Sequence, residues 1–291
     1  MIKPLGPAAW LVIVATVPAA ACGQQQSDPW TSVGRILKTE NVSSTPYHRY
    51  NLPRTDMTLN VGGVDASVFG LGQWVGFSGE VDDATMMGDL VVSPAELGAV
   101  LSELSRQEVD VTAIHNHLAG ASPEVVYVHF RAHGDAADLA TRVDRAIALT
   151  STPRPTPAPT SEPVQIDTTL VFRTLGQSGS ASGTVARLAF QLVDEPVTVQ
   201  GRPVDPALAH RTPITVQMVE ADRAVASGDF AVRADVAVDV VNALARGGIT
   251  ATAMHSHLVE EQPQLRYIHF WADGSLLTVL EGLRSALDAA R

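Results

Sequence analysis

The sequence has a single cysteine, few aromatic residues and a deficit of basic side chains. One cysteine cannot form an internal disulfide, so the chain is not a disulfide-stabilised scaffold. Basic residues number 20 against 31 acidic ones, and a net charge of -11 excludes the basic footprint that nucleic acid requires. Aromatic residues make up 5% of the chain, which argues against an aromatic-lined carbohydrate groove.

Familiar catalytic signatures are also missing from the sequence. It contains no glycine-rich phosphate loop, no G-x-S-x-G nucleophile elbow and no H-E-x-x-H zinc helix. The apolar run at residues 8–17 is too short to form a stable transmembrane span. The sequence therefore leaves open whether the protein is an enzyme, and it names no reaction.

The N-terminal segment, residues 1–22, has the features of a bacterial lipoprotein signal. The apolar run at 8–17 is followed by small residues at 19–21 and then by Cys22, the order that a lipoprotein signal peptidase needs. We expect acyl chains, palmitate among them, on Cys22, and residues 23–29 as a polar tether. The predicted location is the outer or periplasmic face of the cell membrane, with the lipid anchor as the membrane contact. The alternative is a secreted protein, cut by an ordinary signal peptidase.

The remainder of the chain is a tandem duplication. Between residues 111–135 and 251–275, 11 of 25 positions are identical without a gap, at an offset of 140. A segment with five prolines, residues 151–163, separates the copies as an extended spacer. The predicted units are therefore repeat 1 at 30–150 and repeat 2 at 164–291.

Each repeat is predicted to be an α+β unit, a small antiparallel or mixed sheet with two helices, and the two repeats to be related by a pseudo-two-fold axis. Ser93 and Pro94 are expected as the N-cap and first residue of a helix. The strands expected in repeat 1 are 47–52, 57–61, 74–78, 90–92, 111–118 and 125–132. The helices expected are 95–107, 136–148, 234–246 and 276–289.

Seven of the nine histidines lie in the duplicated segments. Alternate residues of a strand point to the same face, so His115 and His117 should share a face, as should His129 and His133. Three or four imidazoles could then converge on a divalent transition metal such as zinc, or on a small ligand. The candidate ligands are His115, His117, His129 and His133 in repeat 1, and His255, His257, His269 and Asp273 in repeat 2.

Three functions remain open at this point. The first is binding of a small ligand or metal through these pockets. The second is a metal-dependent hydrolase, for which Glu80 or Glu124 would be the general base. The third is a structural or partner-binding protein whose histidines hydrogen-bond to backbone or to carboxylates such as Asp89, itself expected as a turn residue that opens a strand. The sequence does not say whether the two histidine sets form one site or two.

The repeated pattern A-[IM]-H-[NS]-H-L, then P and Y-[VI]-H-F, preceded by M-x-G-D-L-V, resembles the LppY/LpqO family of bacterial lipoproteins. The resemblance covers nearly all of the chain after the tether. It implies a duplicated domain of unknown function and supports a lipoprotein signal ending at Cys22. It brings no catalytic role; what it transfers is the histidine motif, onto His115, His117, His129, His255, His257 and His269.

Overall fold

The computed structural model describes residues 28–43, 47–156 and 161–291. The predicted signal segment and Cys22 lie outside the described residues, as does most of the predicted tether. Within the described part, no helix is long and apolar enough to span a membrane.

Repeat 1 forms one five-stranded sheet, a short hairpin and four helices. Its elements are α1 (Thr31–Leu37), β1 (Tyr47–Asn51), β2 (Asn60–Val61), β3 (Val64–Asp65), α2 (Ser67–Gly70), β4 (Trp74–Glu80), β5 (Asp83–Val92), α3 (Pro94–Arg106), β6 (Asp110–His115), β7 (Val126–Gly134) and α4 (Ala136–Ile147). The strand order in the sheet is β1-β4-β5-β7-β6, and all its pairs are antiparallel.

Repeat 2 repeats this architecture with one added edge strand. Its elements are α5 (Thr168–Leu175), β8 (Gly179–Ser182), β9 (Val185–Gln191), β10 (Thr198–Val199), β11 (Arg202–Pro203), α6 (Pro206–Ala209), β12 (Arg211–Met218), β13 (Arg223–Arg233), α7 (Ala237–Arg246), β14 (Thr250–His255), β15 (Glu261–Gln262), β16 (Leu265–Ser275) and α8 (Leu276–Ala289). The sheet order is β14-β16-β13-β12-β9-β8, again antiparallel, and β10, β11 and β15 form a separate small sheet. The predicted α+β class and tandem repeat are confirmed.

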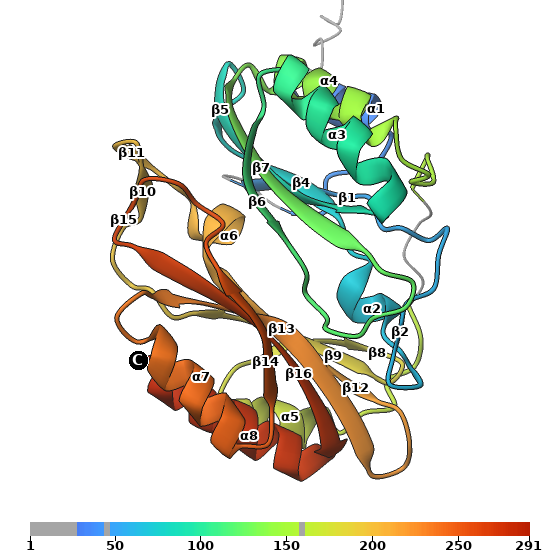
Figure 1. Cartoon of the computed structure of the whole chain (residues 1–291), viewed down its shortest axis with the longest axis vertical. Helices are drawn as coiled ribbons and strands as arrows, with labels where there is room; N and C mark the ends of the chain where they lie inside the picture. The colour runs from blue at the N-terminus through green and yellow to red at the C-terminus, as the bar shows by residue number, and fades with distance from the viewer. Residues whose placement is uncertain (1–27, 44–46, 157–160) are drawn as a thin grey trace, which may run out of the picture.

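The two sheets face each other, and the helices lie outside them (Figure 1). Helices α1, α3 and α4 cover the outer face of the first sheet, while α5, α7 and α8 cover that of the second (Figure 1). Each helix layer and its sheet enclose one large apolar core, as expected when an amphipathic helix packs on one face of a sheet. The inner faces of the two sheets are not covered by these helices, and they are buried by packing against each other.

Apolar side chains join the repeats at two places on these inner faces. In one cluster, Tyr47 and Met87 of repeat 1 pack with Leu208 and Tyr267 of repeat 2. In the other, Leu118 and Tyr127 belong to repeat 1, and Trp271 of repeat 2 packs against the same cluster. Because each repeat sends side chains into the other's cluster, the two repeats form one packed body around the space between the sheets.

Helix α3 starts where the sequence predicts. Ser93 and Glu96 form a capping box, and Pro94 occupies the first turn, where its missing N–H costs nothing. Three strand and helix predictions differ from the structure. The strand expected at 57–61 is reduced to β2, and the strand expected at 90–92 is the end of the longer β5. Each repeat has four helices among the described residues where two were expected; the additional short helices are α1 and α2 in repeat 1 and α5 and α6 in repeat 2. Strand β5 is buried on both faces, so its sequence lacks the alternation that reveals a half-buried strand.

Candidate metal centre between the sheets

Six of the predicted histidines meet in one cluster between the sheets. They come from β6, β7, β14 and β16 and from the residues that follow the two edge strands. The closest pairs of histidine rings all cross between repeats, with centroids 4.1 Å apart for His115 and His255, 3.9 Å for His117 and His269, and 4.4 Å for His129 and His257. The two histidine sets thus form one site.

The contacts follow the pseudo-two-fold relation of the repeats. His115 and His255 are equivalent residues and stack on each other, as expected for residues beside the axis. Away from it, the second histidine of each H-x-H motif contacts the strand histidine of the other repeat: His257 stacks on His129, and His117 lies against His269 with the two rings tilted by 31°. Neither repeat could build this arrangement alone.

Strand register places the histidines on the inner face. His129 of β7 lies opposite Ala113 of β6 on one side and opposite Asp89 of β5 on the other. Directly opposed residues of an antiparallel pair share a face, so all three side chains point toward the other sheet. The small side chain of Ala113 leaves room there for the imidazole of His129.

Asp89 belongs to this site, although it was expected to be a turn residue. It lies in the interior of β5, is 6% exposed, and places Oδ2 3.4 Å from Nε2 of His117. The preceding Gly88 points to the opposite face, where a Cβ atom would come within 2.4 Å of the Phe130 ring and of the Trp74 carbonyl oxygen. The Gly-Asp pair occurs in both copies, as Gly88-Asp89 and Gly228-Asp229. This retention was the signal in the sequence that could have identified Asp89 as a site residue.

Two tyrosines close the ends of the cluster. His117 stacks on Tyr127 with centroids 3.4 Å apart, and His257 stacks on Tyr267 at 4.0 Å. Each phenol donates a hydrogen bond to a backbone carbonyl: Tyr127 to that of Gly70, and Tyr267 to that of Ala209. The rings are thereby held rigidly, which restricts the orientation of the imidazoles beside them.

Burial is graded across the cluster. His129, His257 and His269 are buried, whereas His115, His117 and His255 keep partial solvent access. The partly accessible side provides a path by which an ion or small molecule could enter.

Burial keeps the imidazoles neutral. Desolvation lowers the pKa of His115 to about 2 and that of His117 to about 3, and it lowers those of His129 and His255 to about 4. Burial shifts carboxylates in the opposite direction: it raises the pKa of Asp229 to about 8, with a contribution from Asp89. At neutral pH the cluster therefore offers uncharged nitrogen donors.

Many of these ring nitrogens have no hydrogen-bond partner among the described residues. They include both nitrogens of His255, Nδ1 of His115, and Nε2 of His257 and of His269. Buried polar atoms are normally satisfied, and leaving one unsatisfied costs about 1–3 kcal/mol. A purely structural role for the histidines would predict satisfied nitrogens, so the cluster instead has the character of a binding site.

Two groups within the cluster bring ligand atoms within 4.8 Å of one another. One is His115, His255, His257 and His269, with members from both repeats; the other is Asp89, His115 and His117. Donor atoms around a tetrahedral zinc ion lie about 3.4 Å apart, so side-chain movements of about 1 Å would close either group around an ion.

Two predicted ligands lie elsewhere. His133 is at the far end of β7, where its Nε2 lies 2.7 Å from Oδ1 of Asp83. Asp273 is at the corresponding end of β16 and forms an ion pair with Arg223 at 2.8 Å. Both residues have the strand parity expected of the inner face. However, each lies four residues beyond the cluster histidine of its strand, His129 in β7 and His269 in β16.

The carboxylates considered as general bases are both exposed. Glu80 ends β4 at an exposed hairpin, and Glu124 is exposed in the connection between β6 and β7. No hydrogen bond or ion pair within the described residues joins either side chain to a histidine. No contact within the described residues therefore assigns either carboxylate to the cluster as a base.

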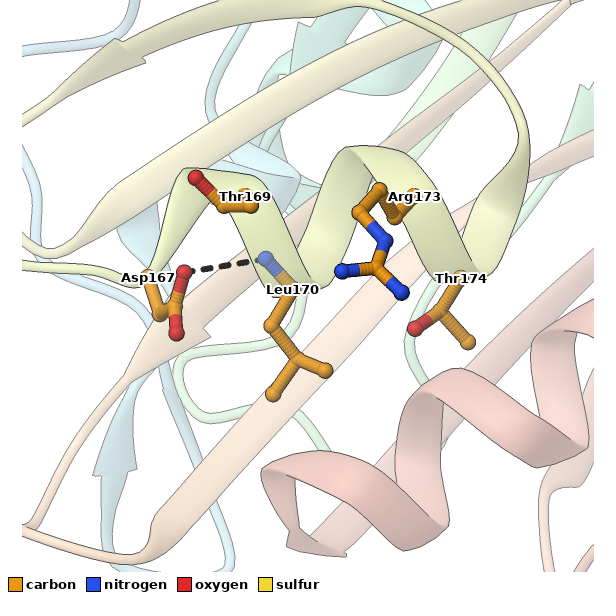
Figure 2. A pocket seen from close by; sticks show the side chains of 5 residues that line it. All are labelled: Asp167, Thr169, Leu170, Arg173 and Thr174. Carbon is orange, nitrogen blue, oxygen red and sulfur yellow. Dashed lines mark hydrogen bonds between the residues drawn. The ribbon is translucent and has the colours of Figure 1, made fainter.

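A surface hollow on α5 offers no comparable chemistry. It is lined by one helix and its cap, Asp167, Thr169, Leu170, Arg173 and Thr174 (Figure 2). Asp167 is engaged there, because its carboxylate accepts a hydrogen bond from the Leu170 N–H at 2.9 Å (Figure 2). The hollow lies on the outer helix layer, on the opposite side of the sheet from the histidines.

Comparison with known proteins adds a family but no activity. The model of a family described as Domain of Unknown Function (DUF1259) matches residues 31–149 and again 169–289. No curated protein matches the chain. Among solved structures, EtuB from Clostridium kluyveri is 13% identical over 87% of this chain and 90% of that one, with a TM-score of 0.21, a value that supports no inference about fold or function.

Proposed function

The chain belongs to the DUF1259 family, with the domain present twice, and we propose that it is an envelope-anchored lipoprotein that binds a divalent transition-metal ion between its two repeats. The ligands are His115, His255, His257 and His269. The observation that carries the proposal is that these four imidazoles, contributed by both repeats, hold donor atoms within 4.8 Å of one another while several of their nitrogens lack hydrogen-bond partners.

The donor chemistry favours a particular class of ion. Neutral imidazole nitrogen suits zinc, copper, nickel and iron, whereas calcium and magnesium prefer oxygen. The low histidine pKa values mean that no proton has to be displaced from a cationic imidazolium before an ion binds at neutral pH. Copper(II) and zinc(II) are the ions to test first, because copper(II) stands highest in the divalent affinity series and zinc(II) accepts four nitrogen ligands.

Metal content tests this function directly. The protein, purified without chelators, is expected to contain at least one equivalent of a transition metal, or to take it up from zinc or copper solution, as measured by plasma mass spectrometry. The double substitution His257→Ala/His269→Ala should abolish binding at the four-histidine group, because it removes two of the four ligands and both buried ones.

A matched control is available in the same fold. His133→Ala removes a histidine of β7 that lies outside the cluster, and it should leave the metal content unchanged. A protein that stays empty after zinc, copper and iron challenge would refute the metal-binding proposal. Loss of metal in the His133→Ala variant would equally refute the assignment of these ligands.

The lipoprotein part of the proposal rests on the sequence. Small residues at positions 19–21 precede Cys22 after an apolar run, and the repeated histidine motif resembles that of the LppY/LpqO lipoproteins. Acyl chains on Cys22 would hold the histidine centre outside the cytoplasm, where it would meet extracytoplasmic metal.

Substitution of the cysteine separates anchoring from metal binding. Cys22→Ser should move nearly all of the protein from the membrane fraction to the soluble fraction and abolish incorporation of radiolabelled palmitate in cells. Metal content should not change, because no ligand is altered. Continued membrane association without label would show that the chain is held in another way.

A further inference from the structure

The four-histidine group leaves part of the cluster without a role. Asp89, His117 and one nitrogen of His115 lie beside it, and together these residues form the second group of ligand atoms within 4.8 Å. Nε2 of His117 lies 3.0 Å from Nε2 of His115 and 3.4 Å from Oδ2 of Asp89. All three atoms therefore point into one small volume.

The buried carboxylate has no adequate partner. Asp89 is 6% exposed, and its Oδ1 accepts no hydrogen bond from the described residues. The groups that influence it are His115, His129 and Arg49, and the two imidazoles are neutral at pH 7. A buried carboxylate is costly unless a charge or hydrogen bonds compensate it, and a divalent cation in contact with it would do so.

We propose that the centre holds a second divalent transition-metal ion, bound by Asp89, His115 and His117, and that His115 bridges the two ions. This rests on the proposed function, since the first ion occupies the four-histidine group. A ring nitrogen has one lone pair, so His115 can serve both groups only through its two nitrogens. Its Nε2 faces His117, whereas its Nδ1 is buried without a partner and is left for the first ion.

Bridging has a defined proton balance. Neutral imidazole carries one N–H proton, and it can bind a second ion only as imidazolate. Binding of the second ion therefore forms one metal–nitrogen bond, breaks one N–H bond of His115 and releases one proton to solvent. No electron is transferred in this step.

The second site is a property of repeat 1 alone. The equivalent carboxylate, Asp229, lies 3.8 Å from Nδ1 of His269 but completes no group of three ligand atoms within the described part of the chain. His115 and His117 are also partly exposed, in contrast to the buried His257 and His269. The second ion would thus have three protein ligands and an accessible position for water or an exogenous ligand, as catalytic zinc sites do.

Copper(II) titration of the whole protein tests the proposal. Equilibrium dialysis with plasma mass spectrometry should give two ions per chain in the wild type. Asp89→Asn and His117→Ala should each reduce this to one, whereas Asp229→Asn, which removes the equivalent buried carboxyl from the other repeat, should retain two. Circular dichroism of the four proteins establishes that each is folded.

Electron paramagnetic resonance tests whether His115 bridges the two copper ions. The copper signal should grow up to one equivalent and then decline toward zero at two, because an imidazolate couples two copper(II) spins antiparallel. A wild type that saturates at one ion refutes the second site and leaves the proposed function intact; a wild type that binds none refutes both. Two ions with full, additive signal would refute the bridge by His115.

Discussion

The metal-free protein is expected to lose about 4 kcal/mol of unfolding free energy when the pH falls from 6.5 to 5. The cause is the histidine cluster, in which burial lowers the pKa of His115 to about 2, of His117 to about 3, and of His129 and His255 to about 4. In the unfolded chain the same imidazoles titrate near pH 6.5.

The sign follows from proton counting. Between pH 6.5 and 5 the unfolded chain binds protons on these four histidines and the folded chain scarcely does, so acid favours unfolding. Their stabilisation is complete above about pH 7.5 and is lost as the pH falls toward the folded-state values. Asp229 acts in the opposite direction, since its pKa of about 8 means that the folded state holds a proton there that the unfolded state binds only near pH 4.

Urea unfolding at a series of pH values measures this effect. The free energy of unfolding should be nearly constant from pH 8 to 7 and should then fall steeply. His115→Gln/His255→Gln should flatten the profile, because two of the titrating groups are removed, while His133→Ala should leave it steep. A profile for the metal-free wild type that stays flat down to pH 5 would show that the imidazoles are not held neutral by burial.

Arg54→Ala is expected to destabilise the protein by about 3–5 kcal/mol. The Arg54 side chain is 1% exposed, forms ion pairs of 2.9 Å with both Asp56 and Glu96, and donates to the Val91 carbonyl at 2.7 Å. Burial by itself would raise the pKa of Glu96, but hydrogen bonds from the Ser93 N–H and from Arg54 outweigh it and lower this pKa to about 2. Truncation would leave a partly buried carboxylate and a buried carbonyl without their donor.

An exposed arginine on α3, the helix that carries Glu96, provides the control. Arg106 is 71% exposed, and its partner Glu103 keeps the hydrogen bond that Gln107 Nε2 donates at 2.8 Å, so Arg106→Ala should cost less than about 1 kcal/mol. Both variants are compared by urea unfolding at pH 7.5. Equal losses in the two would contradict the role given to burial, and a loss below about 1 kcal/mol for Arg54→Ala would contradict the ion-pair network.

Local physics explains what the sequence predicted well. The duplication is visible because matched residues recur at one spacing, and α3 was predictable because Ser93, Glu96 and Pro94 act within a single turn. Strand β5 was only partly predicted, since a strand buried on both faces has no alternation to detect.

By itself, the sequence determined that there are two copies of one α+β unit and that the histidines of each copy lie on one face of its sheet, because strand parity is a property of neighbouring residues. Only the tertiary structure decided that these faces meet, that His117 contacts His269 and His129 contacts His257, and that Asp89 joins them while His133 and Asp273 do not. Parity specifies a face of a strand, but the position along that face where another sheet packs depends on contacts between residues more than a hundred positions apart.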